Sequence, residues 1–293
     1  MRGDVTGGSF PLTGDLALTR MGFGAMQLAG PGVWGPPLDR GAVIRVLRTV
    51  AELGLTHIDT AGYYGPDVVN DLIREALHPY PDTLHIVTKV GYRRTRDRSW
   101  QSALSRDDLV SSVHGNLRHL GLEALDVVNL RVGGPAGGPA PGSVAEPFGV
   151  LAELQSQGLI RYLGVSNVTL DQLAEARTVA RVVCVQNHYN LAHRQDDPLL
   201  DRCAADGTAF VPFLPLRGFP PAQAAALDDI AARLGASAQQ LALAWLLHRS
   251  PNILLIPGTS SVAHLRDNVN AAHVDLPLDA RAALNAIGAA SRR

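Results

Sequence analysis

Short, mostly apolar runs alternate with longer segments of helical periodicity along most of the chain. Runs of this kind are typical of parallel strands that helices cover on their outer side. The predicted strands are Met21–Gly24, Thr56–Thr60, His85–Lys89, Asp126–Leu130, Tyr162–Val165, Val182–Gln186, Ala209–Phe213 and Ile253–Ile256.

The intervening segments carry signals for helix starts and ends. Asp39 is placed to cap a helix over Gly41–Leu53, and Gly54 follows that helix where a left-handed residue is favoured. Ser105 precedes a second clear helix over Arg106–Leu120. The glycines placed to end this helix and three later ones are Gly121, Gly158, Gly207 and Gly235.

Eight strand–helix units in fewer than 300 residues predict an α/β fold of the (β/α)₈ TIM-barrel type. A doubly wound sheet has the same alternation, but its glycine fingerprint is incomplete here, because Gly22–Gln27 lacks the third glycine. Before the first barrel strand, Phe10–Leu18 predicts a β-hairpin that turns at Thr13-Gly14-Asp15. We therefore expect one barrel domain over residues 1–293 with an N-terminal hairpin.

Two long loops are predicted at the carboxyl ends of the strands, where barrel enzymes keep their sites. Val132–Ser143 is rich in glycine and proline and is either a tolerated insertion or part of the site. The other loop follows the third strand and carries Arg93, Arg94, Arg96, Arg98 and Trp100. Its charges form either a solvated face or an anion-binding or substrate-gating element.

Composition narrows the class of protein. Hydrophobic residues make up 46% of the chain and charged residues 18%, a balance typical of a packed globular protein. The 26 Lys and Arg nearly equal the 27 Asp and Glu, so the net charge does not point to a protein that binds nucleic acid or an anionic membrane. Two cysteines and scattered histidines predict neither a disulfide framework nor a metal site. The sequence shows neither the apolar run of a signal peptide nor an apolar stretch long enough to span a membrane. We therefore expect a cytoplasmic enzyme that acts on a small molecule, as a monomer or a simple homo-oligomer.

Candidate catalytic residues follow the second and third strands. Asp59 on a buried strand needs a partner, and Lys89 ends the adjacent strand. Tyr64 in the intervening loop is placed to reach both. The set is either a structural ion pair beside a core tyrosine or an acid catalyst, in which the ammonium lowers the phenol pKa from about 10.

Several motifs, in order and in spacing, resemble the aldo-keto reductase superfamily. They are His57-Ile58-Asp59-Thr60-Ala61 with Tyr63-Tyr64-Gly65, Thr88-Lys89, Gly164-Val165-Ser166-Asn167, and Ile256-Pro257-Gly258-Thr259-Ser260. Within that superfamily the chain resembles the bacterial pyridoxal reductases most closely, through Gly24–Val33, Cys184–Asn187 and Gly258–Leu265.

The resemblance implies hydride transfer from NADPH, with Tyr64 as the proton donor beside Asp59 and Lys89. The positions that it implies for the cofactor are Ala25, Met26, Gln27, Asp59, Ser166, Asn167, Gln186, Phe213, Pro215, Leu216, Gly258, Thr259, Ser260, His264, Asp267 and Asn268. Among these, Ser166, Asn167 and Gln186 would hold the nicotinamide amide, and Phe213 would stack on its ring. Trp34, Tyr63, Tyr64 and Arg131 are the expected substrate-binding residues.

The chain departs from the family pattern at one catalytic position. The fourth member of the family's tetrad is usually a histidine near the end of strand four, and Arg131 stands there. An arginine cannot shuttle a proton, because its pKa exceeds about 12, but it can stabilise a developing oxyanion. We interpret Arg131 as polarising the carbonyl or orienting the substrate. A structural arginine paired with a carboxylate is the alternative.

The sequence therefore predicts an NADPH-dependent reductase of an aldehyde, with pyridoxal reduced to pyridoxine as the leading reaction. One alternative is a ketoreductase for a keto-sugar or another secondary metabolite. A second is a non-catalytic NADPH-binding redox sensor, which the arginine at the fourth position would suit.

Overall fold

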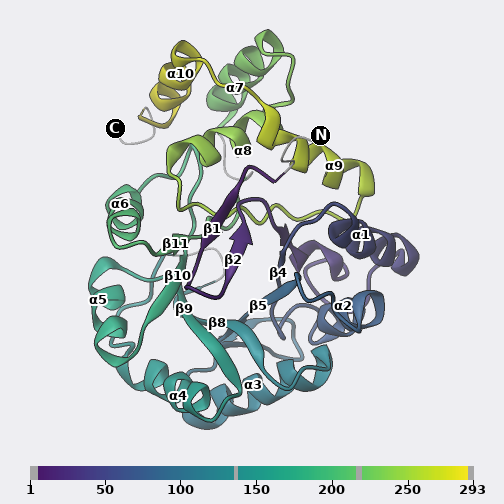
Figure 1. The fold of residues 1–293 in the computed structure, drawn as a ribbon, viewed down its shortest axis with the longest axis vertical. Helices are drawn as coiled ribbons and strands as arrows, with labels where there is room; N and C mark the ends of the chain where they lie inside the picture. The colour runs from purple at the N-terminus through teal and green to yellow at the C-terminus, as the bar shows by residue number, and fades with distance from the viewer. Residues whose placement is uncertain (1–5, 135–137, 216–219, 290–293) are drawn as a thin grey trace.

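The computed structural model describes residues 6–134, 138–215 and 220–289 of the 293 residues in the chain. Within these ranges a sheet of seven parallel strands curls around a central axis, and helices surround it (Figure 1). Neighbouring strands in the sheet follow the order β3, β4, β5, β8, β9, β10, β11. Their bounds are β3 Phe23–Gly24, β4 His57–Asp59, β5 His85–Val90, β8 Leu125–Arg131, β9 Ile160–Ser166, β10 Val182–Gln186 and β11 Ala209–Phe210.

The predicted eighth strand closes the barrel without forming a full strand of its own. Ile253 bridges Phe210 on one side, and Leu255 bridges Met21 on the other, both in parallel. Backbone hydrogen bonds join both edges, including Leu254 N to Phe210 O at 2.9 Å and Leu255 N to Arg20 O at 2.7 Å. Only single bridges form on either side of this segment, yet the ring of strands is continuous. The predicted barrel is confirmed.

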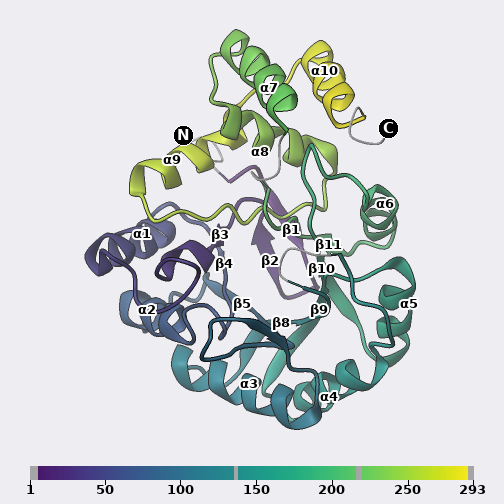
Figure 2. The ribbon, with the colours of Figure 1, turned by 180° about the vertical axis from the view of Figure 1, so that it is seen from behind.

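The predicted N-terminal hairpin closes one end of the barrel. Strands β1 (Ser9–Pro11) and β2 (Ala17–Thr19) pair antiparallel and lie across the barrel end that faces the viewer in Figure 1. Leu12, Leu16 and Leu18 are buried in one cluster with inward-facing strand residues such as Val127. Apolar side chains therefore fill this end of the barrel. The opposite end faces the viewer in Figure 2.

The helices begin and end where the sequence places their caps. Asp39 accepts a hydrogen bond from Ala42 N at 2.8 Å, and Ser105 accepts one from Asp108 N at 3.2 Å. Gly54, with φ of 74°, is in the left-handed region, where its missing side chain avoids strain. The helices are α1 Arg40–Glu52, α2 Val68–Leu77, α3 Arg106–Leu120, α4 Ala145–Ser156, α5 Leu170–Val179, α6 Asp197–Ala205, α7 Pro221–Arg233, α8 Ala238–Arg249, α9 Val262–Asn270 and α10 Leu278–Ala289.

The arginine-rich segment after the third barrel strand is a β-hairpin, which corrects the prediction of a loop. Strands β6 (Tyr92–Arg94) and β7 (Trp100–Ser102) pair antiparallel. The Arg94 guanidinium lies 5.3 Å from the Trp34 ring centre and 4.2 Å from that of Trp100, and it donates to Val33 O at 2.8 Å. This arginine therefore ties the hairpin to the loop after β3 instead of facing solvent.

The glycine- and proline-rich loop over 132–143 packs against the next strand–helix unit. Asn167 Nδ2 donates to Gly138 O at 3.0 Å, and Gln172 Nε2 donates to Ala140 O at 2.8 Å. Its described residues form neither helix nor strand. Side chains of the β9–α5 unit thus hold the loop at the same barrel end as the ends of β8 and β9.

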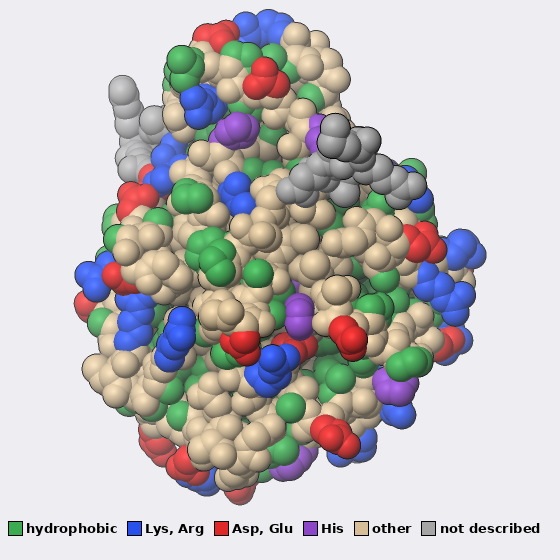
Figure 3. Space-filling view, viewed as in Figure 1, with side chains coloured by type: hydrophobic (Ala, Val, Ile, Leu, Met, Phe, Trp, Pro, Cys, Tyr) green, Lys and Arg blue, Asp and Glu red, His purple; other side chains and the backbone are tan. Residues whose placement is uncertain are grey.

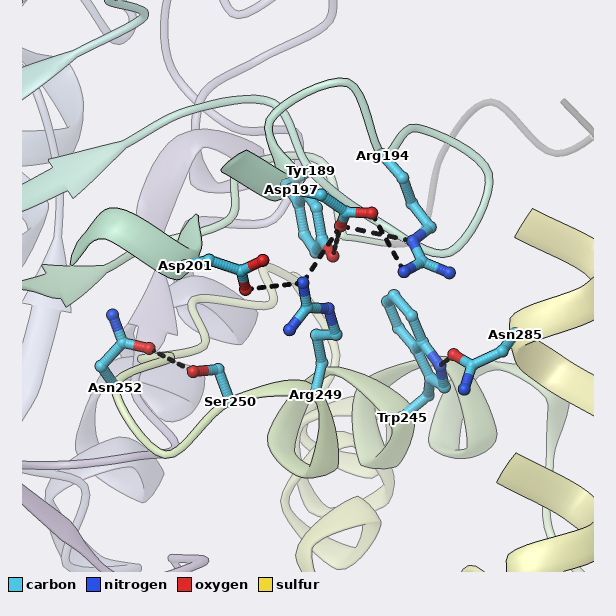
Figure 4. A network of polar contacts seen from close by, with 9 residues as sticks. All are labelled: Tyr189, Arg194, Asp197, Asp201, Trp245, Arg249, Ser250, Asn252 and Asn285. Atoms are coloured by element: carbon cyan, nitrogen blue, oxygen red, sulfur yellow. Dashed lines mark hydrogen bonds and ion pairs between the residues drawn. The ribbon is translucent and has the colours of Figure 1, made fainter. Parts of the chain in front are cut away.

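A polar network joins the loop after β10 to α6, α8 and α10 (Figure 4). Asp197 accepts from the Tyr189 hydroxyl at 2.6 Å and pairs with Arg194 at 3.1 Å. Arg249 on α8 pairs with Asp201 at 2.8 Å, and Trp245 Nε1 donates to an asparagine of α10. These partly buried contacts hold α8 and α10 against the loop after β10 and against α6. The residues in the network do not include the candidate catalytic residues.

The distribution of surface charge, the lengths of the helices and the placement of possible metal ligands concern the expected partners. Acidic and basic side chains are interspersed over the face in Figure 3. Within the described ranges, no helix has both the length and the apolar character needed to span a membrane, and no cluster of His, Cys, Asp or Glu is suited to hold a metal ion.

Candidate active site

A cavity of about 370 Å³ opens at the carboxyl ends of the strands. Asp59, Tyr64, Lys89 and Arg131, which the sequence singles out as catalytic, all line it. A second hollow of about 460 Å³ adjoins it and shares Met26 with its wall. The structure therefore brings the four candidate catalytic side chains to one place.

The cavity floor holds a buried ion pair. Lys89 at the end of β5 donates from Nζ to Asp59 Oδ1 at 2.6 Å and to Thr60 O at 2.9 Å. Both residues are 3% exposed. The second carboxylate oxygen of Asp59 accepts from Gln186 Nε2 at 2.8 Å. The carboxylate and the ammonium are thus satisfied by each other and by fixed neutral groups, as buried charges must be.

A chain of buried amides and hydroxyls positions the strands that carry this pair. Thr60 Oγ1 donates to Asn70 Oδ1 at 2.8 Å, and Asn70 Nδ2 donates to Asn116 Oδ1 at 2.9 Å. Thr88 Oγ1 donates to the same Asn116 oxygen at 2.7 Å. Because Thr60 and Thr88 adjoin Asp59 and Lys89 in sequence, the network links this ion pair to α2 and α3. The sequence analysis did not predict this network. The signal that could have indicated it is an asparagine on the apolar face of each of the helices α2 and α3.

Tyr64 is buried beside this pair, but its acidity differs from the sequence prediction. The Lys89 ammonium lies 5.0 Å from the centre of the Tyr64 ring. Burial raises the pKa of Tyr64 above its usual 10.0, and the Asp59 carboxylate raises it further, against a smaller lowering by Arg131. The predicted lowering of this pKa is wrong, because burial and the Asp59 carboxylate together outweigh the lowering by the neighbouring cation. The raised pKa keeps Tyr64 protonated, which is the form that its predicted role requires.

Arg131 ends β8 and points into the cavity, with 7% of its surface exposed. Its Nη1 donates to Ser166 Oγ at 3.0 Å and its Nη2 to Gly134 O at 3.1 Å. Its guanidinium carbon lies 4.7 Å from the centre of the Phe213 ring. Neutral oxygens and an aromatic ring therefore orient this cation above the Asp59–Lys89 pair.

The three residues expected to hold a nicotinamide amide are buried at the ends of β9 and β10, next to the cavity but not among its lining residues. Ser166 accepts from Arg131, and Asn167, with φ of 61°, turns its amide toward the loop over 132–143. Gln186 Oε1 is a buried acceptor with no hydrogen-bond partner among the described residues. An amide NH₂ group would supply the donor that this oxygen lacks.

The expected phosphate-binding segment stands at the start of α9. Ser261 caps this helix by accepting from His264 N, and Thr259 Oγ1 accepts from Ser261 N at 3.1 Å. Gly258 lines the cavity at the barrel seam, where a Cβ would lie 2.5 Å from Gly24 O. A helix N-terminus beside two hydroxyl-bearing residues is a suitable site for a phosphate.

The remaining predicted cofactor positions are divided between the cavity and its surroundings. Met26, Gln27, Phe213 and Pro215 line the cavity, and Ser260 lines the adjoining hollow. Ala25 and Asn268 are buried, whereas His264 is exposed. Asp267 accepts from Gln240 Nε2 at 2.7 Å and so contacts the start of α8. Leu216 lies outside the described residues.

Aromatic residues form one wall of the cavity. Tyr63 lines it, as the sequence predicts for a substrate-binding residue, and so does Trp100. Trp34 instead lies behind this wall, beneath Arg94 and Arg98. Sequence reasoning placed Trp100 in a loop and missed it as a wall residue, because the β6–β7 hairpin that presents it was hidden in a run of charges.

Fold and site together define a class of protein: a parallel barrel whose mostly apolar cavity is lined by a tyrosine and a buried aspartate–lysine pair. Residues 20–289 match the aldo/keto reductase family. The chain belongs to this family and is an oxidoreductase.

Similar proteins agree with this assignment. The chain is 58% identical over 275 residues to pyridoxine 4-dehydrogenase of Escherichia coli K12, covering 94% of this chain and 96% of the relative. It is 40% identical to an uncharacterised oxidoreductase of Schizosaccharomyces pombe, over 94% of this chain and 88% of the relative. A crystal structure of a thermostable aldo-keto reductase in complex with the inhibitor epalrestat superposes with a TM-score of 0.80 at 31% identity, covering 94% and 97% of the two chains.

Proposed function

We propose that this protein reduces an aldehyde with NADPH and that its substrate is pyridoxal, which it converts to pyridoxine. The observation that carries the proposal is the buried Asp59–Lys89 pair beside Tyr64 in a cavity that Arg131 also lines. The identity of 58% to a pyridoxine 4-dehydrogenase over nearly the whole of both chains supports the choice of substrate.

The residues present fit a nicotinamide dinucleotide. Gln186 Oε1 offers a buried acceptor for the amide of the ring, and the cavity reaches Gly258, which leads to the start of α9. Ser166 and Asn167 offer further polar groups near that amide. Thr259, Ser260 and the N-terminus of α9 would hold phosphate. When bound, the reduced ring supplies the hydride for the carbonyl carbon.

The protein's own residues then act on the carbonyl oxygen. Tyr64 donates a hydrogen bond to that oxygen and gives it a proton as negative charge develops. Lys89 and Arg131 stabilise the developing charge, and Asp59 keeps Lys89 charged and oriented. The apolar wall excludes water from the reacting atoms. In the reverse direction Tyr64 takes the proton back from the alcohol.

The experiment that tests the function follows oxidation of NADPH with pyridoxal, and NADPH binding by fluorescence. The wild-type protein should reduce pyridoxal. Tyr64→Phe should lose about 10²–10⁴-fold in kcat, the usual contribution of a general acid, while its NADPH affinity stays close to that of the wild type. An active Tyr64→Phe would assign the acid elsewhere. Turnover of ketones but not aldehydes would favour the ketoreductase, and tight NADPH binding without any turnover would favour the redox sensor.

Three further expectations stay predictions. We propose that residues 1–293 form one barrel domain, that the enzyme works in the cytoplasm, and that it is a monomer or a simple homo-oligomer. Size-exclusion chromatography with light scattering tests the last of these directly.

A further inference from the structure

One residue in the wall of the cavity has a strained backbone. Val33, in the loop after β3, lines both the cavity and the adjoining hollow. Its φ of 57° lies in the left-handed region, which residues branched at Cβ rarely adopt, because the side chain crowds the backbone there. Strain of this kind persists only where the surrounding structure holds the residue, and it clusters at functional sites. The contacts that hold Val33 are therefore candidates for a functional role.

The Val33 carbonyl accepts hydrogen bonds from two segments that are distant in the sequence. Arg94 Nη1 on β6 donates to it at 2.8 Å, and Gly65 N donates to it at 3.3 Å. Gly65 directly follows Tyr64 in the chain. The position of Val33 therefore depends on the β6–β7 hairpin and on the loop that carries the proposed proton donor.

Arg94 also holds the backbone of its own hairpin. Its Nη2 donates to Arg98 O at 2.9 Å and to Gly32 O at 3.2 Å. Arg98, like Val33, is in the left-handed region, with φ of 66°. A planar guanidinium donates several hydrogen bonds in fixed directions, which the single ammonium of a lysine does not reproduce. One side chain thus connects two strained backbone segments, one in the loop after β3 and one in the hairpin.

The same guanidinium lies over two tryptophan rings. Its carbon is 4.2 Å from the centre of the Trp100 ring and 5.3 Å from that of Trp34, within the range of cation–π attraction. Trp100 lines the cavity, and its ring meets that of Tyr63 edge to face at 5.5 Å. Arg94 therefore holds two parts of the cavity wall, the Val33 backbone and the Trp100 ring.

We propose that Arg94 is a positioning residue that determines which aldehydes the enzyme prefers. By holding Val33 and Trp100 it keeps this wall rigid, so that a flat aromatic ring packs against Trp100 while its aldehyde group reaches Tyr64. The inference rests on the proposed function and narrows the substrate class to aromatic aldehydes. A saturated ring is thicker and gains no aromatic contact, so it fits the same wall less well. Arg94 acts through Val33 and Trp100 and not on the reacting atoms.

Two aldehydes with the same numbers of carbon and oxygen atoms test this inference. Benzaldehyde has a flat ring, and cyclohexanecarbaldehyde has a saturated one. Oxidation of NADPH gives kcat and KM for each, and the ratio of kcat/KM for benzaldehyde to that for cyclohexanecarbaldehyde is the aromatic preference. Pyridoxal is assayed in parallel, and thermal unfolding followed by circular dichroism checks that each variant is folded.

Trp100→Leu should lower the aromatic preference by about threefold to tenfold, the amount that an aromatic contact adds beyond the area it buries. Arg94→Met should lower it by a similar factor, mainly through a higher KM for benzaldehyde, because Tyr64 and Lys89 are unchanged. Arg94→Lys keeps the charge but lacks the planar fork and should give an intermediate value. The variant with both Arg94→Met and Trp100→Leu should fall no more than about twofold below Trp100→Leu, because Arg94 acts on this preference through the Trp100 ring.

Arg96→Met is the matched control. Arg96 is exposed in the turn of the same hairpin, and no hydrogen bond or ion pair joins it to the described residues. This variant should keep the aromatic preference of the wild type. Acrylamide quenching of tryptophan fluorescence gives a second measurement that needs no turnover. Quenching should increase in Arg94→Met, in which Trp34 and Trp100 lose the guanidinium that covers them, and stay unchanged in Arg96→Met.

Two outcomes would overturn the inference while the reductase function stands. A wild-type aromatic preference in Arg94→Met would show that the wall does not depend on the guanidinium; if that variant does not fold, the same result in Arg94→Lys would show it. A further loss by the full factor when Arg94→Met is added to Trp100→Leu would show that Arg94 does not act through that ring. Failure of the wild type to reduce any aldehyde, pyridoxal included, would instead refute the proposed function and this inference with it.

Discussion

Replacing Lys89 by methionine removes the cation from the buried pair and keeps a side chain of similar length. Asp59 would lose a hydrogen bond of 2.6 Å and retain only the 2.8 Å bond from Gln186, and it is 3% exposed. Breaking a buried ion pair by removing one partner costs about 3–5 kcal/mol, because the remaining charge is not compensated. For a chain of this size that corresponds to a fall in melting temperature of roughly 10 °C.

The assay is thermal unfolding followed by circular dichroism, with a second variant and a control. Asp59→Asn combined with Lys89→Met should recover most of the lost stability, since the charge that was left unpaired is gone. Arg161→Met removes a 2.9 Å pair with Asp126 on a side chain that is 43% exposed and should cost less than about 1 kcal/mol. If Lys89→Met melted at the wild-type temperature, or if the double variant were no more stable than the single one, the pair would not be a buried, mutually dependent unit.

Three further perturbations test other parts of the structure. Burial and the neighbouring His85 lower the pKa of His57 to about 4. As the pH falls from 6.5 to 4, the unfolded chain therefore gains a proton that the folded protein does not, and the free energy of unfolding should fall by roughly 3 kcal/mol. Denaturant unfolding measured against pH should show this fall, and His57→Asn should make it smaller. Gly24→Ala places a Cβ 2.4 Å from Ile256 O at the barrel seam and should lower the melting temperature, whereas Gly115→Ala, on an open helix face, should raise it slightly. Asn116→Leu breaks the network behind Asp59 and Lys89 and should lower kcat more than NADPH affinity, as steady-state kinetics and fluorescence titration would show.

The adjacency of Asp59 and Lys89 was predictable because of the topology. In a parallel barrel, consecutive strands pair, so polar residues at the ends of β4 and β5 must meet at one end. The helix caps at Asp39 and Ser105 were predictable for a local reason: a side-chain oxygen needs only the backbone three residues ahead.

Other features depend on contacts between segments that the sequence does not relate. The charge run that contains Arg94 gave no sign that this arginine would lie against Trp34 and Trp100, because cation–π contacts follow from the tertiary path of two separate segments. The acidity of Tyr64 was misjudged for a similar reason. A motif shows that a lysine is near the phenol, whereas burial and the Asp59 carboxylate decide the sign of the pKa shift.

The raised pKa of Tyr64 is consistent with catalysis, because the enzyme needs its charge stabilisation in the transition state and not before. The Lys89 ammonium is engaged by Asp59, and burial keeps Tyr64 from ionising. In the proposed reaction, negative charge would develop on the carbonyl oxygen in front of Tyr64, within a low-dielectric cavity where the cations of Lys89 and Arg131 would act strongly. The positive groups therefore stabilise the developing oxyanion more than the resting phenol, which is the difference that lowers a barrier.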